Sequence, residues 1–153
     1  MNKLQAVSSL CHAFPELDAR VAESAALCAD SQPPSIDVYD FACFLASLED
    51  HEDGRLKAAF FLVENFLVHG APELRDWVDQ LIEALQNICA WRHQNAGIFL
   101  ASLGRETRAL WEHLESIRSA SSDLDLSDCS VLEAEILTWR LLREKSRASS
   151  AAA

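Results

Sequence analysis

Glycine and proline are rare in this chain, and no segment alternates strictly between apolar and polar residues. Each of the two residue types occurs only four times in 153 residues. Strands with one solvent-exposed face need that alternation, and the turns between them need glycine, proline or similar residues. Because both signals are missing while half of the residues are hydrophobic, the sequence predicts an all-α protein.

Paired cysteine motifs are also missing. The five cysteines are odd in number and widely scattered, and no C-x-x-C pair is present to bind zinc or exchange disulfides. We expect them to be small buried hydrophobic residues in a protein of the reducing cytoplasm. The N-terminus is too polar for the core of a signal peptide, which agrees with that location.

Positive charge is scarce. The chain has 13 Lys and Arg against 24 Asp and Glu, for a formal net charge of −11. Nucleic acids and anionic membranes attract positive surfaces, so neither is expected as a partner. A macromolecular partner should instead be basic. Most of the negative excess lies between Met1 and Asp53, whereas the last predicted helix is basic.

Residues 56–87 predict two amphipathic helices joined by a Gly-Ala-Pro corner. In the first, from about Gly54 to His69, apolar side chains cover nearly the whole circumference at about 100° per residue. Such a helix is either buried in a core or spans a membrane, and this one is too short and too polar to span. We therefore expect a single-domain bundle of about six to seven helices around this central helix. Asp53 is the expected N-cap, Gly70 the stop signal, and Pro72 the start of the next helix.

The remaining helices should complete one domain over residues 1–147, with residues 148–153 frayed. Pro15 should open the second helix, and Asp37 should cap the third. Ser130 with Glu133 predicts a capping box for the last helix. Leu110, Leu114 and Ile117 are expected to face inward in a helix from about Arg105 to Arg118. The last helix should run through Ile136, Leu137 and Leu141.

Glu64 is the sharpest candidate for a special role, because it sits among apolar positions of the central helix. A buried carboxylate there could act as a general acid or base with a raised pKa. More often such a group accepts hydrogen bonds from a helix N-terminus, a Trp indole or an Arg. No second catalytic group sits at a matching position, so we favour a structural buried carboxylate.

Metal binding and catalysis have little support. Cys89 and His93 stand four residues apart, a spacing at which two ligands share a helix face, but a site needs two more ligands. No glycine-rich loop could hold a phosphate, and no serine lies in a nucleophile elbow. We expect no metal, no cofactor and no enzymatic activity.

Acidic residues are the candidates for a partner-binding surface. A field of negative charge steers a basic partner and raises the association rate, although single acids are usually solvated surface groups. These acids form one surface if the third, fourth and fifth helices are neighbours. The candidates are Glu49, Asp50, Glu52, Asp53, Asp76, Asp79 and Glu83.

Three short segments of the chain form a recognisable pattern. They read Phe60-x-x-Val63-Glu64-x-x-Leu67-x-x-Gly70 followed by Val78, then Ile82-Glu83-x-Leu85, and later Leu103-Gly104-x-Glu106-Thr107-x-x-x-Trp111-x-x-Leu114. This pattern resembles a family of small all-helical bacterial proteins, many of them immunity proteins of polymorphic or contact-delivered toxins. The resemblance covers about Leu56 to Leu114. The family usually has an acid after the glycine, where this chain has Ala71-Pro72, so a role of that acid does not carry over.

The resemblance implies a protein that binds and neutralises a cognate secreted toxin by covering its active site. Toxins that act on nucleic acid or nucleotides need basic clefts, so such a toxin is the expected target of an acidic chain. The alternative is a helical adaptor or regulatory subunit that binds a protein other than a toxin. An enzyme or metal carrier is the third and weakest reading.

Overall fold

The computed structural model describes residues 1–27, 35–48, 53–92, 96–120 and 129–151. Along the chain the helices are α1 (Lys3–Ala13), α2 (Pro15–Leu27), α3 (Val38–Ser47), α4 (Asp53–His69), α5 (Pro72–Trp91), α6 (Gly97–Leu100), α7 (Arg105–Ala120) and α8 (Cys129–Ala151). No strand occurs in these ranges, so the all-α prediction is confirmed. Within the same ranges, no helix combines the length and apolar composition that crossing a bilayer requires.

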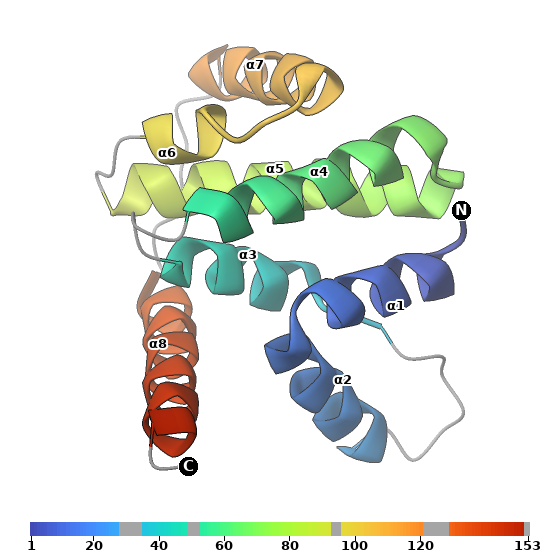
Figure 1. Cartoon of the computed structure of the whole chain (residues 1–153). Coiled ribbons are helices and arrows are strands. Elements are labelled where there is room, and N and C mark those ends of the chain that lie inside the picture. The colour runs from blue at the N-terminus through green and yellow to red at the C-terminus, as the bar shows by residue number, and fades with distance from the viewer. Residues whose placement is uncertain (28–34, 49–52, 93–95, 121–128, 152–153) are drawn as a thin grey trace.

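An antiparallel hairpin of α4 and α5 runs through the molecule (Figure 1). Helices α6 and α7 lie on one side of the hairpin, and α1, α2, α3 and α8 lie on the other. α5 packs against α3, α4, α7 and α8, whereas α4 packs against α1, α5 and α7. The expected bundle around α4 is therefore not observed.

The exposed outer face of α4 shows why this helix is not the centre of a bundle. Phe61 is 70% exposed and Val68 is 42% exposed, because no other helix in the described part of the chain covers this side of α4. Phe60, Val63 and Phe66 on the inner side are completely buried. Apolar residues around the whole helix suggested burial on every side, and that expectation was wrong.

An aromatic cluster joins the helices below the hairpin. The ring centroid of Phe44 in α3 lies 5.5 Å from the ring centroid of Phe14 and 5.1 Å from that of Trp139. Both pairs have edge-on geometry. Phe41 of α3 contacts Trp77 of α5 at 5.5 Å. Edge-on aromatic pairs stabilise a core beyond their buried area, so this cluster holds α1, α3, α5 and α8 together.

A polar network reinforces the contact between α2, α3 and α8. Arg20 Nη2 of α2 lies 3.2 Å from Asp40 Oδ1 of α3 and 2.8 Å from Glu135 Oε2 of α8. The indole Nε1 of Trp139 donates to the same Asp40 oxygen at 3.2 Å. The side chain of Arg143, which is buried, donates to the carbonyl oxygen of Ser47. The inner face of α8 is thus anchored by apolar packing and by hydrogen bonds.

Local signals placed several helix ends correctly. The Asp37 carboxylate accepts hydrogen bonds from the backbone N–H groups of Tyr39 and Asp40, which confirms it as the N-cap of α3. α2 begins at Pro15, and α5 begins at Pro72. α4 ends just before Gly70, where a Cβ atom would collide with the carbonyl oxygen of Phe66. α4 starts at Asp53 itself, so the predicted cap is the first helical residue.

The expected inward face of α7 was partly wrong, because Ile117 is 53% exposed. Helix α7 buries Thr107 and Trp111. Among the described side chains of α8, Ile136, Trp139 and Arg143 are buried, while Leu137 and Leu141 are exposed. Both helices carry apolar residues on more than one side, and the neighbouring helix selects one side.

The ends of α8 also differ from expectation. The helix begins at Cys129, so Ser130 lies inside it and is not its N-cap. The Glu133 carboxylate pairs with Arg92 of α5, whose Nε and Nη2 atoms each lie 3.3 Å from it. The tail that was expected to fray from residue 148 is helical as far as Ala151.

Candidate functional site

Three of the predicted acids form an exposed stripe on α5. Asp76, Asp79 and Glu83 are spaced by three and four residues, so they lie on one helical face, and all three are exposed. Within the described ranges, none of their carboxylates forms an ion pair. We call these three residues the acidic stripe. Together they concentrate negative charge on one exposed face of α5.

The surroundings of Asp79 in the stripe raise the pKa of its carboxyl group. Partial burial raises the pKa of its carboxyl, and the negative charge of Asp76 raises it further. His113 on α7 lowers the pKa by a smaller amount. The ionised form of Asp79 is therefore less favoured than that of a free aspartate, and a cation brought close to the stripe would relieve the repulsion from Asp76.

Helix α7 borders the stripe with basic side chains that sequence reasoning did not identify. Arg118 Nη2 donates to Asn87 Oδ1 at 2.5 Å and to the carbonyl oxygen of Glu83 at 3.4 Å. Burial lowers the pKa of Arg118, and the charges of Glu83 and Glu115 partly oppose this. Only the packing of α7 against α5 brings these groups together, so no sequence signal could have located them.

The acidic run before α4 lies largely outside the part of the chain that the structure describes. Glu49, Asp50 and Glu52 lie outside the described residues, and the side chain of Asp53 does too. Helices α4 and α5 are antiparallel, so the start of α4 lies toward the C-terminal end of α5 (Figure 1). Helix α5 also packs against α3, so α5 is a neighbour of both other helices. That the acidic run and the stripe form one surface stays a prediction.

Glu64 caps the N-terminus of α7. Its Oε1 accepts from the backbone N–H of Glu106 at 2.8 Å. Its Oε2 accepts from the backbone N–H and the hydroxyl of Thr107 at 2.9 and 2.8 Å. The first N–H groups of a helix lack partners within it and carry partial positive charge, so a carboxylate there is stabilising. Of the three donors considered from the sequence, the structure shows the helix N-terminus.

The pKa of Glu64 reflects this cap. Burial alone raises the pKa of the carboxyl, but the hydrogen bonds from Glu106 and Thr107 outweigh it, and the pKa is held below its ordinary value. A general acid or base working near neutral pH needs the opposite shift. The environment of Glu64 therefore suits a bound, ionised carboxylate.

Gly104 makes room for the same carboxylate. A Cβ atom at this position would lie 2.5 Å from Glu64 Oε2 and 2.8 Å from Oε1, closer than van der Waals contact allows. Glu64 belongs to the first segment of the family-like pattern, and Gly104 and Thr107 belong to its last segment. The two segments, 40 residues apart in sequence, meet at one interhelical cap. Trp111, one turn later in α7, is completely buried.

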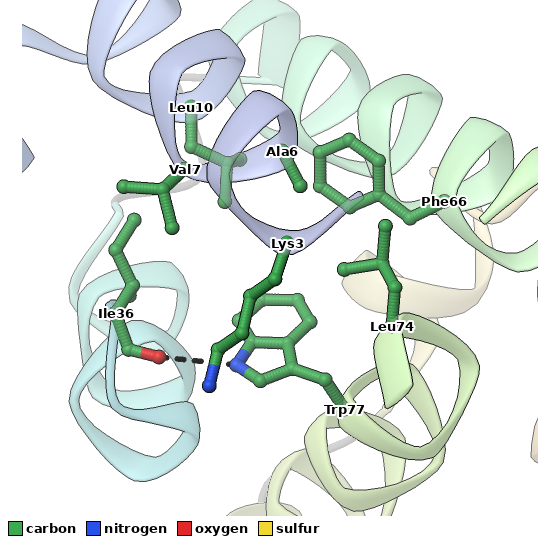
Figure 2. A pocket seen from close by; sticks show the side chains of 8 residues that line it. All are labelled: Lys3, Ala6, Val7, Leu10, Ile36, Phe66, Leu74 and Trp77. Atoms are coloured by element: carbon green, nitrogen blue, oxygen red, sulfur yellow. Dashed lines mark hydrogen bonds between the residues drawn. The ribbon is translucent and has the colours of Figure 1, made fainter. Parts of the chain in front are cut away.

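A small apolar pocket opens between α1, the start of α3, and the hairpin (Figure 2). The indole Nε1 of Trp77 crosses its edge to donate to the carbonyl oxygen of Ile36 at 3.1 Å. The pocket has a volume of about 10 Å³, which has room for roughly one water molecule. A substrate or cofactor does not fit. The lining residues are Lys3, Ala6, Val7, Leu10, Ile36, Phe66, Leu74 and Trp77.

Among the described residues, cysteine and histidine side chains form no metal site. In the described ranges, no three His, Cys, Asp or Glu side chains are placed to hold a metal ion. His93 lies outside those ranges. Cys89 and Cys43 are buried, and burial raises their pKa values to about 11 and about 12. Their thiols are therefore protonated at neutral pH and poorly suited to nucleophilic attack.

Comparison with known proteins adds no relative. No protein-family model matches the chain, and no match was found among curated proteins or solved structures. The resemblance drawn from the short sequence segments therefore stays a prediction.

Proposed function

We propose that the chain is an immunity protein that binds a cognate bacterial toxin and covers its active site. The toxin is expected to have a basic cleft and to act on nucleic acid or nucleotides. The observation that carries the proposal is the acidic stripe, in which three exposed acids share one face of α5 and in which burial and the repulsion from Asp76 together raise the pKa of Asp79. A basic surface seated on the stripe removes that repulsion.

The stripe would act mainly on recognition and rate. Complementary charge steers encounter and rejects wrong partners, and it adds less to affinity than a few buried anchors do. Occlusion of the toxin needs no catalytic group, metal or cofactor on this chain. The proposal therefore includes no enzymatic activity, and it assigns the protein to the cytoplasm, where it would protect the cell that makes it.

Co-expression with the toxin encoded beside the gene tests the function. Cells should survive when the protein is present and die when it is absent. The purified complex should form fast at low salt and more slowly as ionic strength rises, because salt screens exposed charges. If no product of a neighbouring gene binds, the proposal fails and a helical adaptor becomes the better reading.

A matched pair of variants tests the stripe. Asp76→Lys combined with Glu83→Lys should slow association about tenfold or more at low salt. Asp18→Lys combined with Glu23→Lys changes the net charge equally, but at exposed positions of α2 on the other side of the hairpin. This control should slow association much less. Equal slowing by both variants would show that only net charge matters.

The acidic run before α4 has its own variant. Reversing Glu49, Asp50, Glu52 and Asp53 to Lys should slow association if this run also faces the toxin. Comparing the two sets of variants shows which group of acids the toxin contacts. An effect of the run alone would assign the contact to the run in place of the stripe.

A further inference from the structure

Helix α7 starts against α4 and ends against the acidic face of α5. Its first turn is capped by Glu64 of α4. Near its other end, Arg118 Nη2 donates to Asn87 Oδ1 of α5 at 2.5 Å and to the carbonyl oxygen of Glu83 at 3.4 Å. The C-terminal half of α7 therefore lies beside the part of α5 that carries the acidic stripe.

Ile117 is an exposed apolar side chain on the side of α7 that faces the stripe. It is 53% exposed and directly precedes Arg118 in the chain. His113 lies four residues before Ile117, so the two side chains share one helical face. His113 lowers the pKa of Asp79, so this face of α7 is turned toward the stripe. An apolar side chain thus borders the exposed carboxylates of α5.

We call the junction of this face of α7 with the stripe the α5–α7 corner. Its charge balance is negative, because the three exposed carboxylates of the stripe face Arg118 and His113. Within the described ranges, the stripe carboxylates form no ion pair. A complementary partner must therefore bring positive charge, with apolar surface directly beside it to cover Ile117.

Lysine and arginine side chains combine these two properties. Their aliphatic stems pack on apolar surface while the charged group at the end stays with water or with anions. We propose that the α5–α7 corner binds a lysine or arginine side chain of a protein partner. The stem packs on Ile117, and the charged group lies against Asp79 and Glu83. This inference rests on the proposed function, because the basic cleft of the toxin supplies the side chain.

The two parts of the corner act on different rate constants. The carboxylates attract the partner from a distance and so raise the association rate. Ile117 makes its contact only in the docked complex, so it should slow dissociation. Ile117→Ser should therefore make the toxin complex dissociate about fivefold faster or more, because the stem loses its apolar contact. The association rate and its salt dependence should not change. Surface plasmon resonance with the immobilised toxin measures both rates.

The matched control is Leu137→Ser on α8. Leu137 is 47% exposed and lies on the other side of the hairpin, so its loss should change neither rate. Because both residues are exposed, both variants should fold, and circular dichroism checks this. Unchanged dissociation in Ile117→Ser overturns this inference. If the combined Asp76→Lys and Glu83→Lys variant still slows association in that case, the proposed function stands without it.

A small probe tests the corner without the toxin. Acetyl-arginine amide has the aliphatic stem, whereas guanidinium chloride at the same low concentration has the same charge and no stem. In NMR titrations of the full chain, the arginine probe should shift the amide signals around Asp79 and Ile117 more than guanidinium does. Ile117→Ser should remove the difference.

The probe also separates the two proposals. A chain that binds the arginine probe at the corner but binds no toxin supports a site for basic side chains and contradicts the proposed function. Equal shifts from the two probes, or no shifts at the corner, overturn this inference whether or not the toxin binds.

Discussion

The carboxylates of Glu64 and Asp79 lie on the two helices of the same hairpin, yet their pKa values shift in opposite directions. Burial raises the pKa of both groups. Glu64 then meets the N-terminus of α7 and accepts three hydrogen bonds, which bring its pKa below the ordinary value. Asp79 meets another carboxylate, Asp76, which raises its pKa further.

The difference separates an internal contact from a surface that can accept a partner. The charge of Glu64 is satisfied within the chain, so its removal leaves the orphan N–H groups of α7 without an acceptor. The raised pKa of Asp79 means that its negative charge is less favourable in the free protein than in a free aspartate. A basic partner would stabilise that charge. Stability is therefore expected to depend on Glu64, and recognition on Asp79.

The largest effect should come from Glu64→Ala. Loss of the cap removes hydrogen bonds to an ionised group, so the free energy of unfolding should fall by about 1 to 3 kcal/mol. Urea denaturation followed by circular dichroism measures this. Asp79→Ala is the matched control on the hairpin and should change stability by no more than about 0.5 kcal/mol. Toxin protection should follow the amount of folded Glu64→Ala protein. Full stability with lost binding would make Glu64 a contact residue.

Gly104→Ala tests whether the space for the cap matters as much as the carboxylate. The added methyl group would displace the hydrogen-bonded carboxylate of Glu64. The free energy of unfolding should therefore fall by a similar amount, about 1 to 3 kcal/mol. In the Glu64→Ala background the carboxylate is gone, and the same substitution should be nearly neutral. A double-mutant cycle should give a coupling energy of at least about 0.5 kcal/mol. Additive effects would show that Gly104 serves the backbone alone.

The smallest effect should be seen in the pH dependence. The pKa of Glu64 is lower in the folded state, so its stabilisation is present above the unfolded value of about 4.3 and is lost as pH falls through the folded pKa. The pKa of Asp79 is raised, so any stabilisation from its protonated form is lost as pH rises through its folded pKa. A plot of the free energy of unfolding against pH should therefore lose part of its acid-side slope in Glu64→Gln, whereas Asp79→Asn should be slightly more stable than the native chain near neutral pH. The same direction of change in both variants would contradict the comparison.

Much of the local structure could be predicted from residues near each other in the chain. Asp37 caps α3, Pro15 and Pro72 open helices, and Gly70 ends one, because each acts through its own backbone or through N–H groups two or three residues away. The acidic face of α5 followed from helical spacing alone. The residues that approach the acidic stripe and Glu64 from other helices could not be predicted. His113, Arg118 and Gly104 belong to segments that only tertiary packing brings close to them.

The amino-acid sequence by itself determined that the chain is helical, where several helices begin and end, and which acids share the exposed face of α5. These features depend on backbone hydrogen bonding and on a period of 3.6 residues, which act within a few residues. Tertiary structure alone decided which apolar face of α8 is buried, that Phe61 stays exposed, and that Glu64 meets α7. Burial and capping depend on the neighbouring helix. A helix such as α8, with apolar residues on two sides, could pack with either side inward, and its neighbour α3 determines which side is buried.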